Sequence, residues 1–299
     1  MTLGPGELYA LGCALAWAVA VILFRQSGES LAPFALNLFK NLMVVPLFLL
    51  TILLINGELA WPAIPLPELG LVLLSGFIGI AVGDTLYFRA LNRVGASRVA
   101  VAQTLYSPFV IGLSMVWLGE RLGLVQWVGV VLVLAGILLV TFQHAASREH
   151  ARLDRIGIAT AVLSVFMMAV GIVIAKPLLE RYDFLWVVLL RILGGLVGML
   201  AVVLWRRNAR ALLHAYRRVR HWPQVIAGGL MGTYVSMMLW LAGYKYTQAS
   251  IAAILNELAA VFIVILAVWL LREPLRLRQA VGMSAAMGGV LLVLLNGSY

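Results

Sequence analysis

The sequence contains ten apolar runs, each about as long as a helix that crosses a membrane. A helix needs about 20 apolar residues to span the ~30 Å hydrocarbon core of a bilayer. Transmembrane strands are about half that length and alternate apolar with polar residues, so these continuous runs predict helices. The predicted spans are 7–24, 34–55, 69–88, 98–118, 124–142, 156–176, 184–205, 224–243, 249–271 and 277–295.

The composition supports a membrane location. Hydrophobic residues make up 63% of the 299 residues and charged residues 11%, whereas a soluble domain has about 45–50% and about 25%. The chain has too little polar surface for a water-soluble globule, and its hydrophobicity excludes disorder. The single cysteine, Cys13, excludes an internal disulfide and has no His or Cys beside it for a metal site. We expect an all-α integral membrane protein without a metal or cofactor.

The chain also contains an internal repeat. A shift of 153 residues aligns 76–138 with 229–291 without a gap, and 19 of the 63 pairs are identical. A shift of 151 residues aligns the part before this region and places Lys40 on Arg191. The sequence therefore predicts a duplicated unit of five helices.

Two units of five helices, residues 1–148 and 149–299, must lie upside down relative to each other, because five is an odd number. We predict ten transmembrane helices in a 5+5 inverted repeat whose two halves superpose about an axis in the membrane plane. Such repeats are common in secondary transporters, whose binding site lies near the midplane where the repeats meet.

Lysine and arginine are distributed unequally between the two sets of predicted loops. The odd-numbered loops hold 16 of these residues and the even-numbered loops hold 4. Because cytoplasmic loops carry the excess of Lys and Arg, we expect both termini on the periplasmic side of a bacterial inner membrane. Loop 206–223 holds six arginines, which the same rule explains without a nucleic-acid partner; contact with lipid headgroups is an expected side effect.

Four ionisable residues lie well inside the predicted spans, away from their ends, and their charges sum to zero. A charge in the bilayer costs several kcal/mol and usually faces a cavity or a partner, so we expect these side chains to face the bundle interior. The predicted orientation of the helices places Lys40 and Asp84 in the inner half of the membrane, where they are able to pair. It places Arg191 and Glu257 in the outer half, where they are also able to pair. Two interpretations stay open: structural ion pairs, or a charged lining that binds a zwitterion or carries protons.

Polar neighbours accompany these charges. Asn37 and Asn41 share a helix face with Lys40 by their spacing. Asn256 adjoins Glu257, and this pair replaces Gln103 and Thr104 of the other repeat, which breaks the internal symmetry. The candidate substrate or ion path comprises Asn37, Lys40, Asn41, Asp84, Gln103, Tyr106, Arg191, Asn256 and Glu257.

Two repeat-equivalent carboxylates, Glu120 and Glu273, end the fourth and ninth spans. We expect each to cap the N-terminus of the next helix, where the helix dipole is positive. No zinc-protease, nucleophile-elbow or P-loop motif is present, and the four histidines all lie in predicted cytoplasmic loops. We therefore expect a protein that is not an enzyme.

The repeat and its helix-end motif resemble the EamA family of the drug/metabolite transporter superfamily over nearly the whole chain. The first half carries Gly119, Glu120, Arg121, Leu122, Gln126, Gly129 and Gly136, and the second carries Glu273, Pro274, Leu275, Gln279, Gly282 and Gly289, with Arg272 in place of the first glycine. The resemblance implies outward movement of small metabolites, often amino acids, through a central cavity. Members of the family differ widely in cargo, so no substrate contact carries over.

The sequence therefore favours a secondary-active transporter that exports amino acids or similar small metabolites by alternating access, with protons as a candidate coupling ion. One alternative is an antiporter of anionic metabolites or nucleotide sugars, which would need several cavity cations where only Lys40 and Arg191 qualify. A second is a lipid flippase, which would need a lateral opening, and an intramembrane enzyme comes last. The substrate, coupling ion and oligomeric state are left open.

The predicted orientation is testable with reporters fused after Tyr299. We expect alkaline phosphatase fused there to be active, because its disulfides form only in an oxidising compartment such as the periplasm. Activity of a cytoplasmic reporter at the same position would reverse the orientation and every depth assigned from it.

Overall fold

The computed structural model describes residues 3–27, 31, 33–94, 99, 102–146, 154–207, 209–219, 222–271 and 277–295. Within these ranges the chain is all helical and has no strand. Eight of the described helical segments are long and apolar enough to cross a membrane, and Tyr106–Trp117 and Leu124–Leu139 are shorter apolar helices. The protein is therefore an all-α, multi-pass membrane protein.

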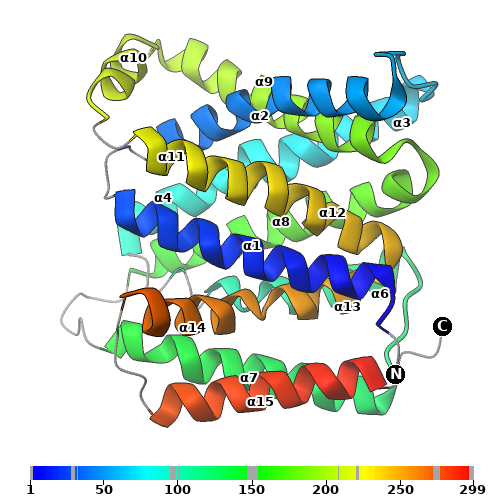
Figure 1. Ribbon diagram of the computed structural model, residues 1–299, viewed down its shortest axis with the longest axis vertical. Coiled ribbons are helices and arrows are strands. Elements are labelled where there is room, and N and C mark those ends of the chain that lie inside the picture. The colour runs from blue at the N-terminus through cyan, green and yellow to red at the C-terminus, as the bar shows by residue number, and fades with distance from the viewer. Residues whose placement is uncertain are drawn as a thin grey trace.

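The helices run side by side in a layered bundle (Figure 1). The first half contains α1 (Pro5–Ser27), α2 (Pro33–Asn56), α3 (Leu66–Gly76), α4 (Asp84–Val94), α6 (Tyr106–Trp117) and α7 (Leu124–Ala146). The second half contains α8 (Arg155–Arg181), α9 (Phe184–Arg206), α10 (Ala209–Arg217), α11 (Trp222–Gly229), α12 (Ser236–Tyr246), α13 (Ala249–Asn256), α14 (Ala259–Leu271) and α15 (Leu277–Leu295). The pair α7 and α15 forms one side of the bundle, α2 and α9 lie on the other, and α1 lies between them.

Two spans that the sequence predicts as plain helices contain a π-helical segment. The first, η1 (Phe77–Gly83), joins α3 to α4, and the second, η2 (Leu230–Val235), joins α11 to α12. A shift of 153 residues carries the start of η1 onto the start of η2. π-Helical segments in proteins often lie at functional sites, so these two positions mark where to look for one.

Two other predicted spans are interrupted. A turn at Thr104 and Leu105 precedes α6, and a turn at Glu257 and Leu258 separates α13 from α14. The shift of 153 residues carries one turn onto the other. Each interruption leaves helix ends inside an apolar segment, and those ends need hydrogen-bond partners.

Glycines bring α7 and α15 into backbone contact at two points. A Cβ atom on Gly129 would lie 2.6 Å from the carbonyl oxygen of Gly289, and one on Gly136 would lie 2.5 Å from that of Gly282. The shift of 153 residues exchanges these two contacts, because it carries Gly129 onto Gly282 and Gly136 onto Gly289. Close approach of this kind is what small residues allow in membrane helices.

The repeat also matches Gly76 with Gly229, but the two glycines approach their neighbouring helices to different extents. A Cβ on Gly76 of α3 would lie 1.8 Å from the carbonyl oxygen of Arg191 in α9, so these two helices touch through their backbones. The equivalent Gly229 of α11 meets only side-chain atoms of α2, with Met43 Cε at 2.8 Å and Lys40 Cβ at 3.8 Å. The α9 span is 67% buried within the structure and the α2 span 28%, so α9 is the more firmly packed of the two equivalent helices.

The close contact of α3 with α9 yields a stability prediction. Gly76→Ala should lower the free energy of unfolding by about 1–3 kcal/mol, because its methyl group has no room against the backbone of Arg191. Gly70→Ala in the same helix is the control, since nothing lies within 4 Å of its Cβ position. Thermal unfolding in detergent measures the stability of both variants. Equal unfolding midpoints for Gly76→Ala and Gly70→Ala would contradict the close contact of Gly76 with the backbone of Arg191.

Candidate functional site

Two clusters of polar side chains lie inside the bundle. The arginine–glutamate cluster contains Ser75, Tyr106, Ser107, Arg191, Tyr244 and Glu257. The lysine–aspartate cluster contains Asn37, Lys40, Asn41 and Asp84. Together they hold seven of the nine residues that the sequence proposes for the path.

Arg191 of α9 is the buried cation of the first cluster, with 2% of its surface exposed. Its Nη1 donates hydrogen bonds to Ser75 Oγ at 3.1 Å and to the carbonyl oxygen of Gly171 at 2.8 Å. Its Nε is buried and has no partner in the structure. The guanidinium is therefore held by neutral acceptors and keeps its Nε–H free.

Two tyrosines of this cluster lie within electrostatic range of both of its charges. The hydroxyl oxygens of Tyr106 in α6 and Tyr244 in α12 are 3.0 Å apart. Both tyrosines interact electrostatically with Arg191 and with Glu257. Because Tyr106 belongs to the first half of the chain and Tyr244 to the second, this hydrogen bond joins the two halves.

Glu257 occupies the turn between α13 and α14. Ser107 donates a hydrogen bond from its Oγ to Glu257 Oε1 at 3.0 Å and a second one from its backbone N–H. Since Ser107 is the second residue of α6, the carboxylate caps the N-terminus of that helix, where the dipole is positive. The sequence allows an ion pair between Arg191 and Glu257, because both are predicted to lie at a similar depth in the membrane. The structure shows no such ion pair between these two described residues, and each has neutral hydrogen-bond partners instead.

The lysine–aspartate cluster joins α2 to α4. Asn41 Nδ2 donates to Asn37 Oδ1 at 3.0 Å, and both amides are almost fully buried. Asp84 is hydrogen-bonded by Asn37 and is attracted by the Lys40 ammonium. Lys40 and Asp84 make no direct ion pair, and both are partly exposed. Their charges therefore stay open to a third group.

The last two residues of the proposed path flank the helix interruptions. Gln103 precedes the turn before α6, and Asn256 ends α13. The side-chain oxygen and nitrogen of Asn256 are buried without a hydrogen-bond partner in the structure. A buried amide with this free capacity suits a polar ligand.

Glu120 caps a helix, but a different one from that expected. Its carboxylate accepts hydrogen bonds from the backbone N–H of Ala249 at 2.7 Å and of Ser250 at 3.0 Å, and from Ser250 Oγ at 2.7 Å. It therefore caps α13 of the other half, while Gln126 accepts the N–H of Gly123 before α7. The fold brings the start of α13 to Glu120, which sequence neighbours cannot reveal. Glu273 lies outside the described residues.

Lys176, at the end of the predicted span 156–176, is one of the four basic residues counted with the even-numbered loops, whereas the structure buries it. Its Nζ donates to the carbonyl oxygens of Tyr244 and Thr247, both at 2.9 Å, and to Glu180 Oε1 at 2.7 Å. Thr247 Oγ1 in turn donates to the buried Glu7 at 2.7 Å. A cation at the C-terminal end of α12 satisfies its last carbonyls, and this fixes the helix that carries Tyr244.

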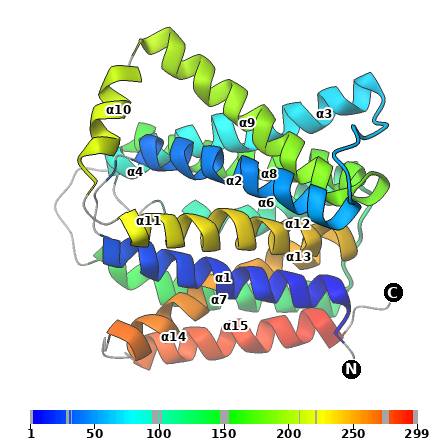
Figure 2. The ribbon, with the colours of Figure 1, turned by 45° about the horizontal axis from the view of Figure 1, so that its top comes forward.

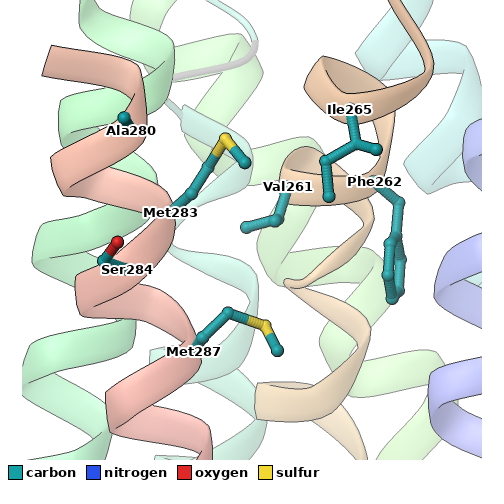
Figure 3. Close-up of a pocket in the computed structure, with 7 residues that line it drawn as sticks. All are labelled: Val261, Phe262, Ile265, Ala280, Met283, Ser284 and Met287. Atoms are coloured by element: carbon teal, nitrogen blue, oxygen red, sulfur yellow. The ribbon is translucent and has the colours of Figure 1, made fainter. Parts of the chain in front are cut away.

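A crevice of about 350 Å³ lies between α14 and α15 (Figure 3). Its walls are Val261, Phe262, Ile265, Ala280, Met283, Ser284 and Met287. Met283 and Met287 point toward Val261 across the gap. With one hydroxyl and no charge among these residues, the crevice suits an apolar filling and offers no path for a headgroup.

A helical bundle that spans the membrane several times and buries polar clusters beside interrupted helices is the architecture of a membrane transporter. The sequence profile of the EamA-like transporter family matches residues 4–142 and 155–295. The chain therefore belongs to the EamA-like transporter family, a family of transporters rather than enzymes.

Individual relatives agree with this assignment. The chain is 23% identical over 288 residues to an uncharacterized transporter of Archaeoglobus fulgidus, covering 96% of this chain and 97% of the relative. It is 27% identical over 184 residues to the uncharacterized transporter YdfC of Bacillus subtilis, covering 62% and 58%. A protein of known crystal structure shares the fold with a TM-score of 0.78 at 19% identity, over 97% of this chain and 96% of that one.

The bonds of Arg191 predict how it responds to a conservative change. Arg191→Lys should lower the free energy of unfolding by about 1.5–3 kcal/mol, because an ammonium cannot reproduce the planar donors that reach Ser75 and Gly171. Arg181→Lys is the control, since Arg181 forms an exposed ion pair with Glu68 and should change stability by less than about 0.5 kcal/mol. Unfolding midpoints that fall equally would contradict the role of the guanidinium geometry.

Proposed function

We propose that the protein is a secondary-active transporter that exports amino acids or similar small metabolites across a bacterial inner membrane by alternating access. One observation carries the proposal: Arg191 and Glu257 each interact electrostatically with the same hydrogen-bonded pair of tyrosines, and the two charged residues form no ion pair with each other. A zwitterion complements this arrangement, with its carboxylate toward Arg191 and its ammonium toward Glu257.

The proposed architecture is a 5+5 inverted repeat with units 1–148 and 149–299. Three matched features support it: the two π-helical segments, the two interrupted helices and the exchanged contacts of α7 with α15. Gly6 and Gly157 supply a fourth, because a Cβ on Gly6 would lie 2.7 Å from Thr247 Cβ and one on Gly157 would lie 2.2 Å from the side chain of its counterpart, Val94.

The charge balance of the clusters favours this substrate class over the alternatives. Each cluster holds one cation and one carboxylate, whereas an antiporter of anionic metabolites or nucleotide sugars would need a surplus of cations. A flippase would need a polar route for headgroups, and the crevice between α14 and α15 has one hydroxyl among its lining residues. The excess of Lys and Arg in the odd-numbered loops supports periplasmic termini.

Transport by the purified protein in proteoliposomes tests the substrate class. A panel of radiolabelled metabolites should show uptake of amino acids or similar small metabolites, and a pH gradient should raise the rate if protons couple transport. The Arg191→Met variant is a control for the substrate carboxylate. Transport restricted to anionic metabolites, unaffected by Arg191→Met, would contradict the proposal.

Glu257 is the proposed proton-coupling residue. Glu257→Gln should fold, because the amide keeps the size of the side chain and can accept from Ser107, and it should change the pH dependence of transport. An unchanged rate and pH profile would rule out the coupling role. If Glu257→Gln fails to fold while the double variant Glu257→Gln/Arg191→Met folds, a structural charge balance explains both residues.

A further inference from the structure

The segment between α9 and α11, expected to be a loop, contains the amphipathic helix α10. Arg210, His214 and Arg217 share one face of α10 by their spacing. Leu212 and Tyr216 share the opposite face, and Leu213 lies between the two faces. No residue of α10 is buried. From residue 184 to residue 256 the sequence contains no Asp or Glu, so no acidic side chain in this stretch neutralises the arginines.

The position of α10 places it at the membrane surface. It follows α9, which is long and apolar enough to span the bilayer, after a residue with positive φ, Arg207 at 51°. Leu204 and Trp205 at the end of α9 are 75% and 83% exposed, and Leu213 is 60% exposed. Exposed apolar side chains beside arginines are the pattern of a helix that lies in the headgroup region.

The other face of α10 holds the start of α2 (Figure 2). Tyr216 donates a hydrogen bond from its hydroxyl to the carbonyl oxygen of Ala35 at 2.9 Å. Burial raises the pKa of Tyr216, so the hydroxyl stays protonated and able to donate. The ring of Phe39 lies 4.9 Å from that of Trp222 and 6.1 Å from that of Tyr216. Because Phe39 precedes Lys40, these contacts fix the part of α2 that carries the lysine–aspartate cluster.

Contacts with α9 also hold that part of α2: Asn37 Nδ2 donates to Met199 Sδ at 3.7 Å, and Ala35 and Leu38 are buried. Met43 separates α2 from Gly229 of α11, whereas the equivalent residue of α9 is Gly194, which allows backbone contact. Pro46 lies inside α2, where it removes a helical hydrogen bond and favours a kink. The contact with α10 thus adds to the contacts with α9 in holding the first turns of α2, ahead of Pro46.

We infer that α10 binds the phosphate groups of anionic phospholipids through Arg210 and Arg217, inserts Leu213 among their acyl chains, and holds the first half of α2 through Tyr216. Anionic lipid then steadies the first turns of α2, which carry Lys40. Nucleic acid is the disfavoured ligand, because an exposed leucine beside the arginines fits hydrocarbon and not a phosphate backbone. The inference requires only that the protein lie in a membrane and does not depend on the proposed substrate.

Hydrogen–deuterium exchange of the full-length protein in nanodiscs tests this inference. Discs of phosphatidylcholine are compared with discs of phosphatidylcholine and phosphatidylglycerol. Phosphatidylglycerol should slow exchange across 209–217 and across 33–45. Arg210→Gln/Arg217→Gln should reduce the slowing by about fivefold for each arginine removed. The control Arg89→Gln/Arg278→Gln removes two exposed arginines outside α10 and should keep the wild-type response.

The two parts of the inference have separate outcomes. Equal exchange of the wild-type protein in the two kinds of disc would overturn lipid binding. Lipid binding by α10 would also be overturned if Arg210→Gln/Arg217→Gln and the control Arg89→Gln/Arg278→Gln reduced the slowing of exchange by the same amount. Tyr216→Phe should keep the slowing across 209–217 and lose it across 33–45. If both segments of Tyr216→Phe still respond to phosphatidylglycerol as the wild type does, the coupling to α2 is overturned.

Discussion

A backbone N–H or C=O that lacks a partner in hydrocarbon costs several kcal/mol, and this constraint governs how the interrupted helices of the protein are held. Glu257 satisfies the start of α6, Glu120 the start of α13 and Lys176 the end of α12. Each of these side chains lies on a different helix or loop from the end it caps. The capped helix ends therefore join distant parts of the chain, and the same side chains place a carboxylate and two tyrosines in the bundle interior.

The sequence alone was sufficient to predict the membrane class and the family, because long apolar runs and matched Glu, Gln and Gly residues are direct signals. Only one interruption has a helix-breaking signal in the sequence: Pro108 lies in the first turn of α6, just after the turn at Thr104 and Leu105. Glu257 indicates a charge without indicating a turn. The arginines of 206–223 suggested a loop, although Leu212, Leu213 and Tyr216 have the spacing of a helix face.

The partners of the charged residues were harder to predict than their presence. Topology gives the depth of a side chain but not its direction around the helix axis, so Arg191 and Glu257 were placed at a common level without the tyrosines beside them. Lys176 was assigned to a loop because it ends an apolar run, yet the carbonyls at the end of α12 draw it inside. Glu120 shows the same principle, since its target lies 129 and 130 residues away in sequence.

The glycine contacts of α7 with α15 have a practical consequence for measurements on the moving protein. Backbones that meet at Gly129 and Gly289 and again at Gly136 and Gly282 leave no side chain between them to act as a spacer. Two such points along one crossing resist both sliding and rotation, so the two helices form a rigid pair. Spectroscopic labels on the outer faces of α7 and α15 thus provide a stationary reference frame, against which displacements of the remaining helices can be measured.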